Sequence, residues 1–119
     1  MQVKKDLNRT RPNCSLFREG GLGQKALENV LITYSKYDRQ VGYVQGMNFI
    51  VGVLLYHSSE EIAFWLFVSL MEDYEMREIY LSGLPGLYKH IYCIQTMMQG
   101  ECRELIEYLV KLKVIIERK

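Results

Sequence analysis

The amino-acid sequence predicts an all-α fold, an irregular domain built from several helices. Apolar residues recur at helical spacing along most of the chain, no alternating strand pattern extends beyond a few residues, and no internal repeat is present. The chain has 119 residues, of which 49% are hydrophobic and 24% charged, as in an ordinary globular protein. This length fits one domain with a small core.

The first two predicted helices carry most of the expected core. Residues 24–38 follow a glycine and place four apolar side chains at the spacing of one helix face: Leu27, Val30, Leu31 and Tyr34. Residues 46–57 are apolar nearly all round. This second helix is therefore predicted to lie at the centre of the fold.

Helix-end signals define the remaining elements. Ser58 and Glu61 have the S-x-x-E spacing of a capping box, which predicts a third helix over residues 59–74. A short helical turn is predicted at 76–81, followed by a Gly- and Pro-containing break at 82–86. The last two helices are predicted at 86–99 and 101–113. An apolar tail follows at 114–119.

Composition excludes several functional classes. Fifteen basic and fourteen acidic residues give a formal charge of +1, so no overall field attracts nucleic acid or an anionic membrane. Three widely spaced cysteines favour neither a disulfide framework nor a zinc site, and a reducing cytosol is expected. His57 and His90 lack neighbours at metal-ligand spacing. The first residues contain no apolar run, so no signal peptide is predicted.

Two further patterns have a plain and a functional interpretation. Residues 20–25 resemble a glycine-rich phosphate loop, but they do not satisfy GxxxxGK[ST], and a turn leading into a helix is favoured. Residues 41–57 contain a GxxxG at Gly42 and Gly46, which in a membrane marks a helix-packing face. That run includes Gln45 and Asn48 and is shorter than the roughly 20 apolar residues of a spanning helix. No transmembrane segment is predicted.

Two segments contain polar residues that the predicted hydrophobic core does not explain. The segments are 6–12, a charged stretch that ends in proline, and 43–48, where a glutamine begins an apolar run. The plain interpretation makes Arg9 a surface residue paired with Asp6. It also lets Gln45 satisfy backbone amides of the first helical turn.

The two segments together resemble a known pair of motifs. Residues 3–10, VKKDLNRT, resemble the IxxDxxRT motif of the TBC domain found in Rab GTPase-activating proteins, with Val in place of Ile. Residues 41–48, VGYVQGMN, resemble the YxQGM motif of the same family. The helix between them fits the family order, as do the stretches 61–71, 84–88 and 101–113. The resemblance spans essentially the whole chain.

The resemblance implies an activity and its residues. In this family the Arg and the Gln of the two motifs enter the active site of a Rab-family small GTPase, which gives Arg9 and Gln45 those roles. A guanidinium can stabilise charge on the transferred phosphoryl group, and an amide can orient the attacking water. Arg11 and Arg39 are rivals on physical grounds alone; the motif register favours Arg9.

The neighbouring motif positions are expected to support these two side chains. Asp6, Thr10 and Tyr43 would support them, and Asn48 would orient the same loop. Gly46 and Met47 complete the motif, with Gly42 and Gly46 expected to allow close backbone approach. No cofactor is expected in this chain, because GTP and Mg²⁺ would arrive bound to the partner. The resemblance places the protein in vesicle trafficking, in the cytoplasm or on endomembranes through that partner.

The resemblance is incomplete at both ends. Residues 1–119 correspond to a partial TBC domain, without the family's upstream Trp-containing segment and without the helices that follow residue 113. Apolar faces left by missing helices would favour self-association or partner binding. The alternative function is therefore a non-catalytic module that binds a GTPase or another protein.

Overall fold

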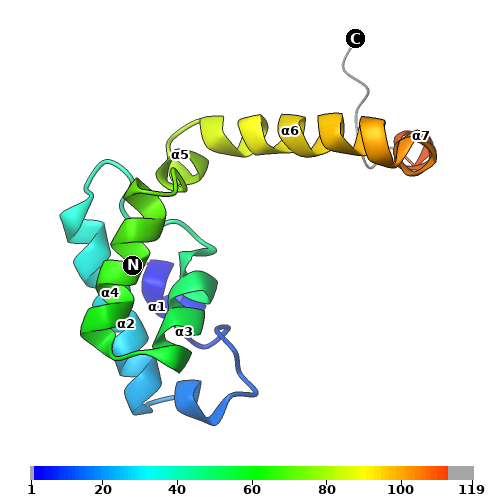
Figure 1. The fold of residues 1–119 in the computed structure, drawn as a ribbon. Helices are drawn as coiled ribbons and strands as arrows, with labels where there is room; N and C mark the ends of the chain where they lie inside the picture. Colours follow the sequence, from blue (N-terminus) through cyan, green and yellow to red (C-terminus); the bar gives the residue numbers. More distant parts are fainter. Residues whose placement is uncertain (1, 113–119) are drawn as a thin grey trace.

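The computed structural model describes residues 2–112, and this part of the chain is helical without strands, which confirms the all-α prediction. Residues 114–119, the predicted apolar tail, and the last residue of the predicted final helix lie outside the described residues. The elements, in chain order (Figure 1), are α1 (Gln2–Leu7), the 3₁₀ helix η1 (Ser15–Phe17), α2 (Leu22–Tyr37), α3 (Met47–His57), α4 (Glu60–Glu72), α5 (Arg77–Tyr80), α6 (Pro85–Glu101) and α7 (Arg103–Lys111).

The helices form a packed body and a projecting arm. Helix α2 packs against α1, η1, α3 and α4, and these elements enclose the core. Helix α6 packs against α5 at one end and α7 at the other, and it extends away from the body (Figure 1). The polar motif segments therefore lie on the body and not on the arm.

The core follows the pattern predicted for α2. Its four apolar stripe residues are all buried: Leu27, Val30, Leu31 and Tyr34. The ring of Tyr34 meets that of Phe67 on α4 edge to face, with centroids 4.8 Å apart, a favourable arrangement for two aromatic rings. Met47 and Val51 of α3 are fully buried in the same core. These contacts fix α2, α3 and α4 against one another.

Helix α3 differs from its prediction in two ways. It packs against α1, α2 and α4, but Phe49, Val53 and Tyr56 are 51%, 41% and 54% exposed, so it is not enclosed on all sides. It also begins at Met47, one residue later than predicted, with Gly46 as its N-cap and Gln45 in the preceding loop. An apolar sequence does not by itself bury a helix; neighbours on every side are needed.

The predicted capping box at the start of α4 is wrong. Ser58 donates its hydroxyl hydrogen to the carbonyl of Leu54, 2.8 Å away, and so serves the end of α3. Ser59 is the N-cap of α4 and makes no side-chain capping bond. Glu60 and Glu61 still place negative charge in the first turn, where it interacts favourably with the helix dipole.

Two short elements near the start of the chain were not predicted. Helix α1 has only six residues, and its sequence is largely charged, so periodicity gives little signal. Val3 and Leu7 are nonetheless buried against the body, one helical turn apart. The 3₁₀ helix η1 adds the buried ring of Phe17. Both elements bring the first polar segment onto the body.

Replacing Phe67, an aromatic residue buried in the core, should test this packing. Phe67→Ala is expected to lower the free energy of unfolding by about 3–5 kcal/mol, because it removes a ring from a filled core. Trp65→Ala, on the exposed side of the same helix, should change it by about 0.5 kcal/mol or less. Urea unfolding followed by circular dichroism measures both. Equal losses in the two variants would contradict the packing described here.

Candidate functional site

The two polar segments meet at the carboxylate of Asp6. This side chain lies on α1 and is 1% exposed. Its Oδ2 accepts a hydrogen bond from the Tyr43 hydroxyl at 2.7 Å, and its Oδ1 accepts one from the Arg9 guanidinium. Asp6 therefore joins the segment that contains Arg9 to the loop that contains Tyr43.

A second route of hydrogen bonds joins the same two segments. Asn48 donates from Nδ2 to Oγ1 of Thr10 at 2.9 Å, and Thr10 donates in turn to the backbone carbonyl of Asp6 at 2.9 Å. Asn48 Oδ1 accepts the backbone N–H of Gly46 at 3.1 Å. Thr10 and Asn48 are both buried. We call the side chains of Asp6, Arg9, Thr10, Tyr43 and Asn48, with the Gly46 amide, the Asp6 network.

The network satisfies its buried polar groups. Within residues 2–112, no buried side-chain nitrogen or oxygen lacks a hydrogen-bond partner. This matters because an unsatisfied buried polar group costs about 1–3 kcal/mol. The buried members of the network, Asp6, Thr10 and Asn48, therefore avoid this cost.

Charge at the centre of the network is fixed by its surroundings. Burial acts to raise the pKa of Asp6, but hydrogen bonds from Tyr43 and Arg9 outweigh it and hold that pKa below its ordinary value. Burial and the adjacent Asp6 carboxylate raise the pKa of Tyr43. Asp6 is therefore ionised at neutral pH, and Tyr43 remains a protonated donor to it.

In the sequence, residues of the Asp6 network flank both Arg9 and Gln45, the two proposed catalytic residues. Arg9 lies between Asp6 and Thr10 in the sequence, and Gln45 lies between Tyr43 and Gly46. Both remain accessible, since the Arg9 side chain is 58% exposed and Gln45 is exposed in its loop. The structure thus binds together the two segments that carry Arg9 and Gln45 while leaving both side chains at the surface.

The plain interpretation of these residues is correct for one and wrong for the other. Arg9 does pair with Asp6, but the carboxylate is buried and bonded to Tyr43, so the pair is not an ordinary surface ion pair. At the start of α3, the side chain that accepts a backbone amide is that of Asn48 and not that of Gln45. Because Asn48 takes the role predicted for Gln45, the Gln45 side chain is left exposed.

The glycines of this loop serve a different purpose from the predicted one. A side-chain carbon added to Gly42 or Gly46 would meet no atom within 4 Å, so neither residue permits a close approach. Their backbones have φ values of +65° and +107°, a region in which glycine is favoured. Met47, the next motif residue, is fully buried and anchors the end of the loop in the core.

The rival arginines lie outside the network. The guanidinium of Arg11 lies 5.8 Å from the ring centroid of Tyr56, at the end of α3, in a cation–π contact. Arg39 is exposed and forms no part of the Asp6 network. Of these three arginines, Arg9 is therefore the one that belongs to the Asp6 network.

Sequence analysis missed the residues that hold the start of the same loop. Asp38 follows α2, and its Oδ1 accepts the backbone N–H groups of Gln40 and Val41, each at 3.2 Å. Arg77 of α5 binds the same carboxylate. An aspartate directly after a helix favours a turn, because its side chain can accept backbone N–H groups further along, so Asp38 could have been found. No local signal identifies Arg77, because its partner lies 39 positions away.

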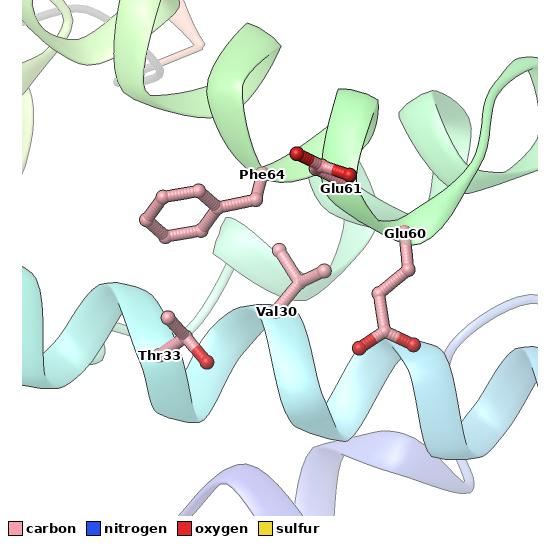
Figure 2. Close-up of a pocket in the computed structure, with 5 residues that line it drawn as sticks. All are labelled: Val30, Thr33, Glu60, Glu61 and Phe64. Carbon is pink, nitrogen blue, oxygen red and sulfur yellow. The ribbon is translucent and has the colours of Figure 1, made fainter.

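A hollow of about 310 Å³ lies between α2 and α4. Figure 2 shows the side chains that line it, with Val30 and Thr33 on one helix and Glu60, Glu61 and Phe64 on the other; neither Arg9 nor Gln45 is among them. In the glycine-rich turn before α2, two backbone N–H groups are already hydrogen-bonded within the protein. The N–H of Gly20 donates to the Gln24 side chain, and the N–H of Gly21 donates to the Arg18 carbonyl. Arg9 and Gln45 lie at the surface, outside this hollow.

Among residues 2–112, no group of three or more His, Cys, Asp or Glu side chains is arranged to hold a metal ion. Over the same range, every helix is too short or too polar to cross a membrane.

The chain belongs to the Rab-GTPase-TBC domain family, whose sequence profile matches residues 1–117. This membership agrees with the all-helical fold and with the order of the two polar segments.

Individual relatives match most of this chain but little of their own length. The human ecotropic viral integration site 5 protein homolog is 43% identical over 104 residues, which are 87% of this chain and 13% of the relative. Rab GTPase-activating protein eat-17 of Caenorhabditis elegans is 40% identical over 103 residues, 87% of this chain and 12% of the relative. Mouse TBC1 domain family member 4 is 40% identical over 105 residues, with shares of 87% and 8%. The chain spans only a small part of these proteins.

The lowered pKa of Asp6 predicts how stability depends on pH. A carboxylate with a depressed pKa in the folded state stabilises the protein above its unfolded pKa of about 3.9, and this stabilisation is lost as pH falls through the folded value. Asp6→Asn should therefore lower the free energy of unfolding by about 1–3 kcal/mol at neutral pH. The difference in free energy of unfolding between Asp6→Asn and the wild type should narrow below about pH 4.

Urea unfolding at a series of pH values measures this gap. Asp73→Asn is the matched control, because Asp73 is an exposed carboxylate bonded only to the hydroxyl of Ser69 among described residues. A gap between Asp6→Asn and wild type that is unchanged in acid would contradict the stated charge of Asp6.

Proposed function

We propose that this chain binds a Rab-family small GTPase and accelerates its GTP hydrolysis by supplying Arg9 and Gln45 in trans. One observation carries the proposal: the Asp6 network ties together the segments of Arg9 and Gln45, which are far apart in the sequence, and leaves both side chains exposed. Membership of the Rab-GTPase-TBC domain family supports the choice of partner. A relative named as a Rab GTPase-activating protein supports it further.

The residue types suit the chemistry of phosphoryl transfer. Charge accumulates on the transferred group as the bond to GDP breaks, and a guanidinium offers five donors in a planar fork to stabilise it. Asp6 accepts a hydrogen bond from Nη2, which orients the guanidinium end of the side chain. The other donors can then reach the partner's phosphates.

Gln45 suits the second task. Its amide can accept from and donate to an attacking water without changing protonation state. Its loop ends at Met47, which is buried in the core, so the backbone beneath it is anchored. Position matters here because misplacing a catalytic group by about 1 Å can reduce the rate by about 10²-fold.

The remaining parts of the proposal follow from the partner. GTP and Mg²⁺ would arrive bound to the GTPase, so this chain would need no cofactor of its own. The protein would act in vesicle trafficking, in the cytoplasm or at endomembranes through its GTPase.

Removing either side chain tests the proposal. Arg9→Ala should reduce stimulated hydrolysis by about 10³- to 10⁵-fold, the contribution of an arginine finger, equivalent to about 4–7 kcal/mol of barrier. Gln45→Ala should also remove most of the stimulation. Single-turnover GTP hydrolysis by a panel of Rab GTPases measures both. The thermal melt of Gln45→Ala should change little, because this side chain is exposed. Arg9→Ala should lower the melting temperature, because the buried Asp6 carboxylate loses a hydrogen-bond partner.

Two matched controls distinguish chemistry from general damage. Arg11→Ala removes a neighbouring arginine that lies over Tyr56, and Gln99→Ala removes an exposed glutamine on α6. Both should retain stimulation. An Arg9→Ala variant as active as the wild type would show that the assigned role is wrong.

A second candidate function rests on exposed apolar side chains. Helices α3 and α4 pack together and carry six large exposed hydrophobic residues: Phe49, Val53, Tyr56, Ile62, Trp65 and Leu66. Such surfaces favour protein contacts. The second proposal is therefore a non-catalytic module that binds a GTPase or another protein and associates with copies of itself.

Light scattering tests the self-association part. The mass of the wild-type chain should rise with concentration, whereas Trp65→Lys, which puts charge on the exposed face, should reduce the rise. Gln99→Lys places the same charge on α6 and should not. A wild-type mass that stays monomeric at every concentration would contradict self-association.

A further inference from the structure

The loop that carries Gln45 is fixed at both ends, and its first end is held by a residue from a distant helix. Arg77, the first residue of α5, donates from Nε to Asp38 Oδ2 at 2.6 Å and from Nη2 to Asp38 Oδ1 at 3.1 Å. The same Nη2 donates to Oε1 of Gln40 at 2.9 Å. Bidentate, charge-assisted bonds of this kind are both strong and directional.

The bonded carboxylate also organises the loop backbone. Asp38 Oδ1 accepts the N–H groups of Gln40 and Val41, and the Asp38 carbonyl accepts the N–H of Gly42 at 2.8 Å. Three successive loop amides are thus bonded to a single residue. Arg77 therefore bonds directly to the residue that orders the backbone leading toward Gln45. The N–H of Asp38 also donates to the Tyr34 carbonyl at 2.9 Å, at the end of α2.

The pair is partly shielded from water. The Asp38 side chain is 12% exposed and that of Arg77 is 30% exposed. Hydrogen bonding from Arg77 is the main cause that lowers the pKa of Asp38, ahead of the opposing effect of burial. The pair is therefore charged at neutral pH and screened less than the exposed ion pairs on this chain.

We propose that Arg77 is a positioning residue for Gln45, acting through Asp38 and Gln40 to hold the start of residues 38–46 while the Asp6 network holds their end. This inference rests on the proposed function, since it assigns the position of Gln45 to a task in GTP hydrolysis. Arg77 itself is not placed at the reacting atoms. It connects α5, which follows α4, to the loop between α2 and α3.

Two variants of Arg77 separate the geometry of its bonds to Asp38 from its charge, and a third variant serves as a control. Arg77→Ala removes every bond, and Arg77→Lys keeps the charge but loses the planar fork. Lys89→Ala is the matched control, because Lys89 forms an ion pair with Glu75 on the surface, 3.3 Å long and with both side chains more than half exposed. Circular dichroism first establishes that each variant is folded.

Hydrogen exchange provides a readout that does not need activity. In Arg77→Ala, the amides of Gln40, Val41 and Gly42 should exchange about 10- to 100-fold faster, since charge-assisted bonds that order the loop are lost. Arg77→Lys should give a smaller increase and Lys89→Ala none. Unchanged exchange at these amides in Arg77→Ala would overturn the inference.

Kinetics provide the second readout. With a Rab GTPase that the wild type stimulates, Arg77→Ala should reduce the maximal single-turnover rate by about 10- to 100-fold, with a smaller change in the concentration needed for half-maximal rate. In a Gln45→Ala background, Arg77→Ala should cause no further loss. A further loss there would show that Arg77 acts by another route and would overturn the inference.

The two proposals fail in different ways. A folded wild-type chain that stimulates no GTPase overturns the proposed function, whatever the exchange data show. Stimulation by the wild type with normal rates in Arg77→Ala overturns the positioning role of Arg77 and leaves the proposed function intact.

Discussion

The buried carboxylate of Asp6 is the constraint on which the arrangement of this site depends. A buried charge is costly unless it is paired and hydrogen-bonded, and Asp6 obtains its partners from both motif segments. The Tyr43 hydroxyl must therefore lie against α1, and the Arg9 guanidinium must stay close to Asp6. The requirement to satisfy one carboxylate thus joins the segment that contains Arg9 to the loop that contains Gln45.

The rest of the body makes this arrangement rigid. Met47 enters the core directly after Gln45, and Asn48 reaches back to Thr10 on the first segment. At the other end of the loop, Asp38 binds backbone amides. The exposed glutamine is therefore carried on a loop that is bonded to the body at both ends, as the role proposed for Gln45 requires.

Periodicity predicted the parts of the fold in which helices bury one regular face. The apolar spacing of α2 was sufficient because its stripe packs on α1, α3 and α4. The same reasoning failed for α1, which is short and mostly charged, and for Ser58, which bonds to the helix before it. It also overestimated the burial of α3, because composition says which residues can be buried and not which faces have neighbours.

The candidate site was predictable only in part. The residues of the Asp6 network stand in two short motifs, so resemblance to a family could identify them, although nothing local says that the motifs touch. Arg77 lies in neither motif, and its pairing with Asp38 is a tertiary contact that the sequence does not signal. Long-range hydrogen bonds of this kind emerge only when the helices are packed.

A double-mutant cycle on Asp6 and Tyr43 tests the central claim most directly. The free energies of unfolding of wild type, Asp6→Asn, Tyr43→Phe and the double variant give the coupling between the two side chains. Because the hydroxyl and carboxylate are 2.7 Å apart in a buried network, the coupling should be about 1–3 kcal/mol. Additive losses, with a coupling near zero, would contradict the claim that this bond joins the two segments.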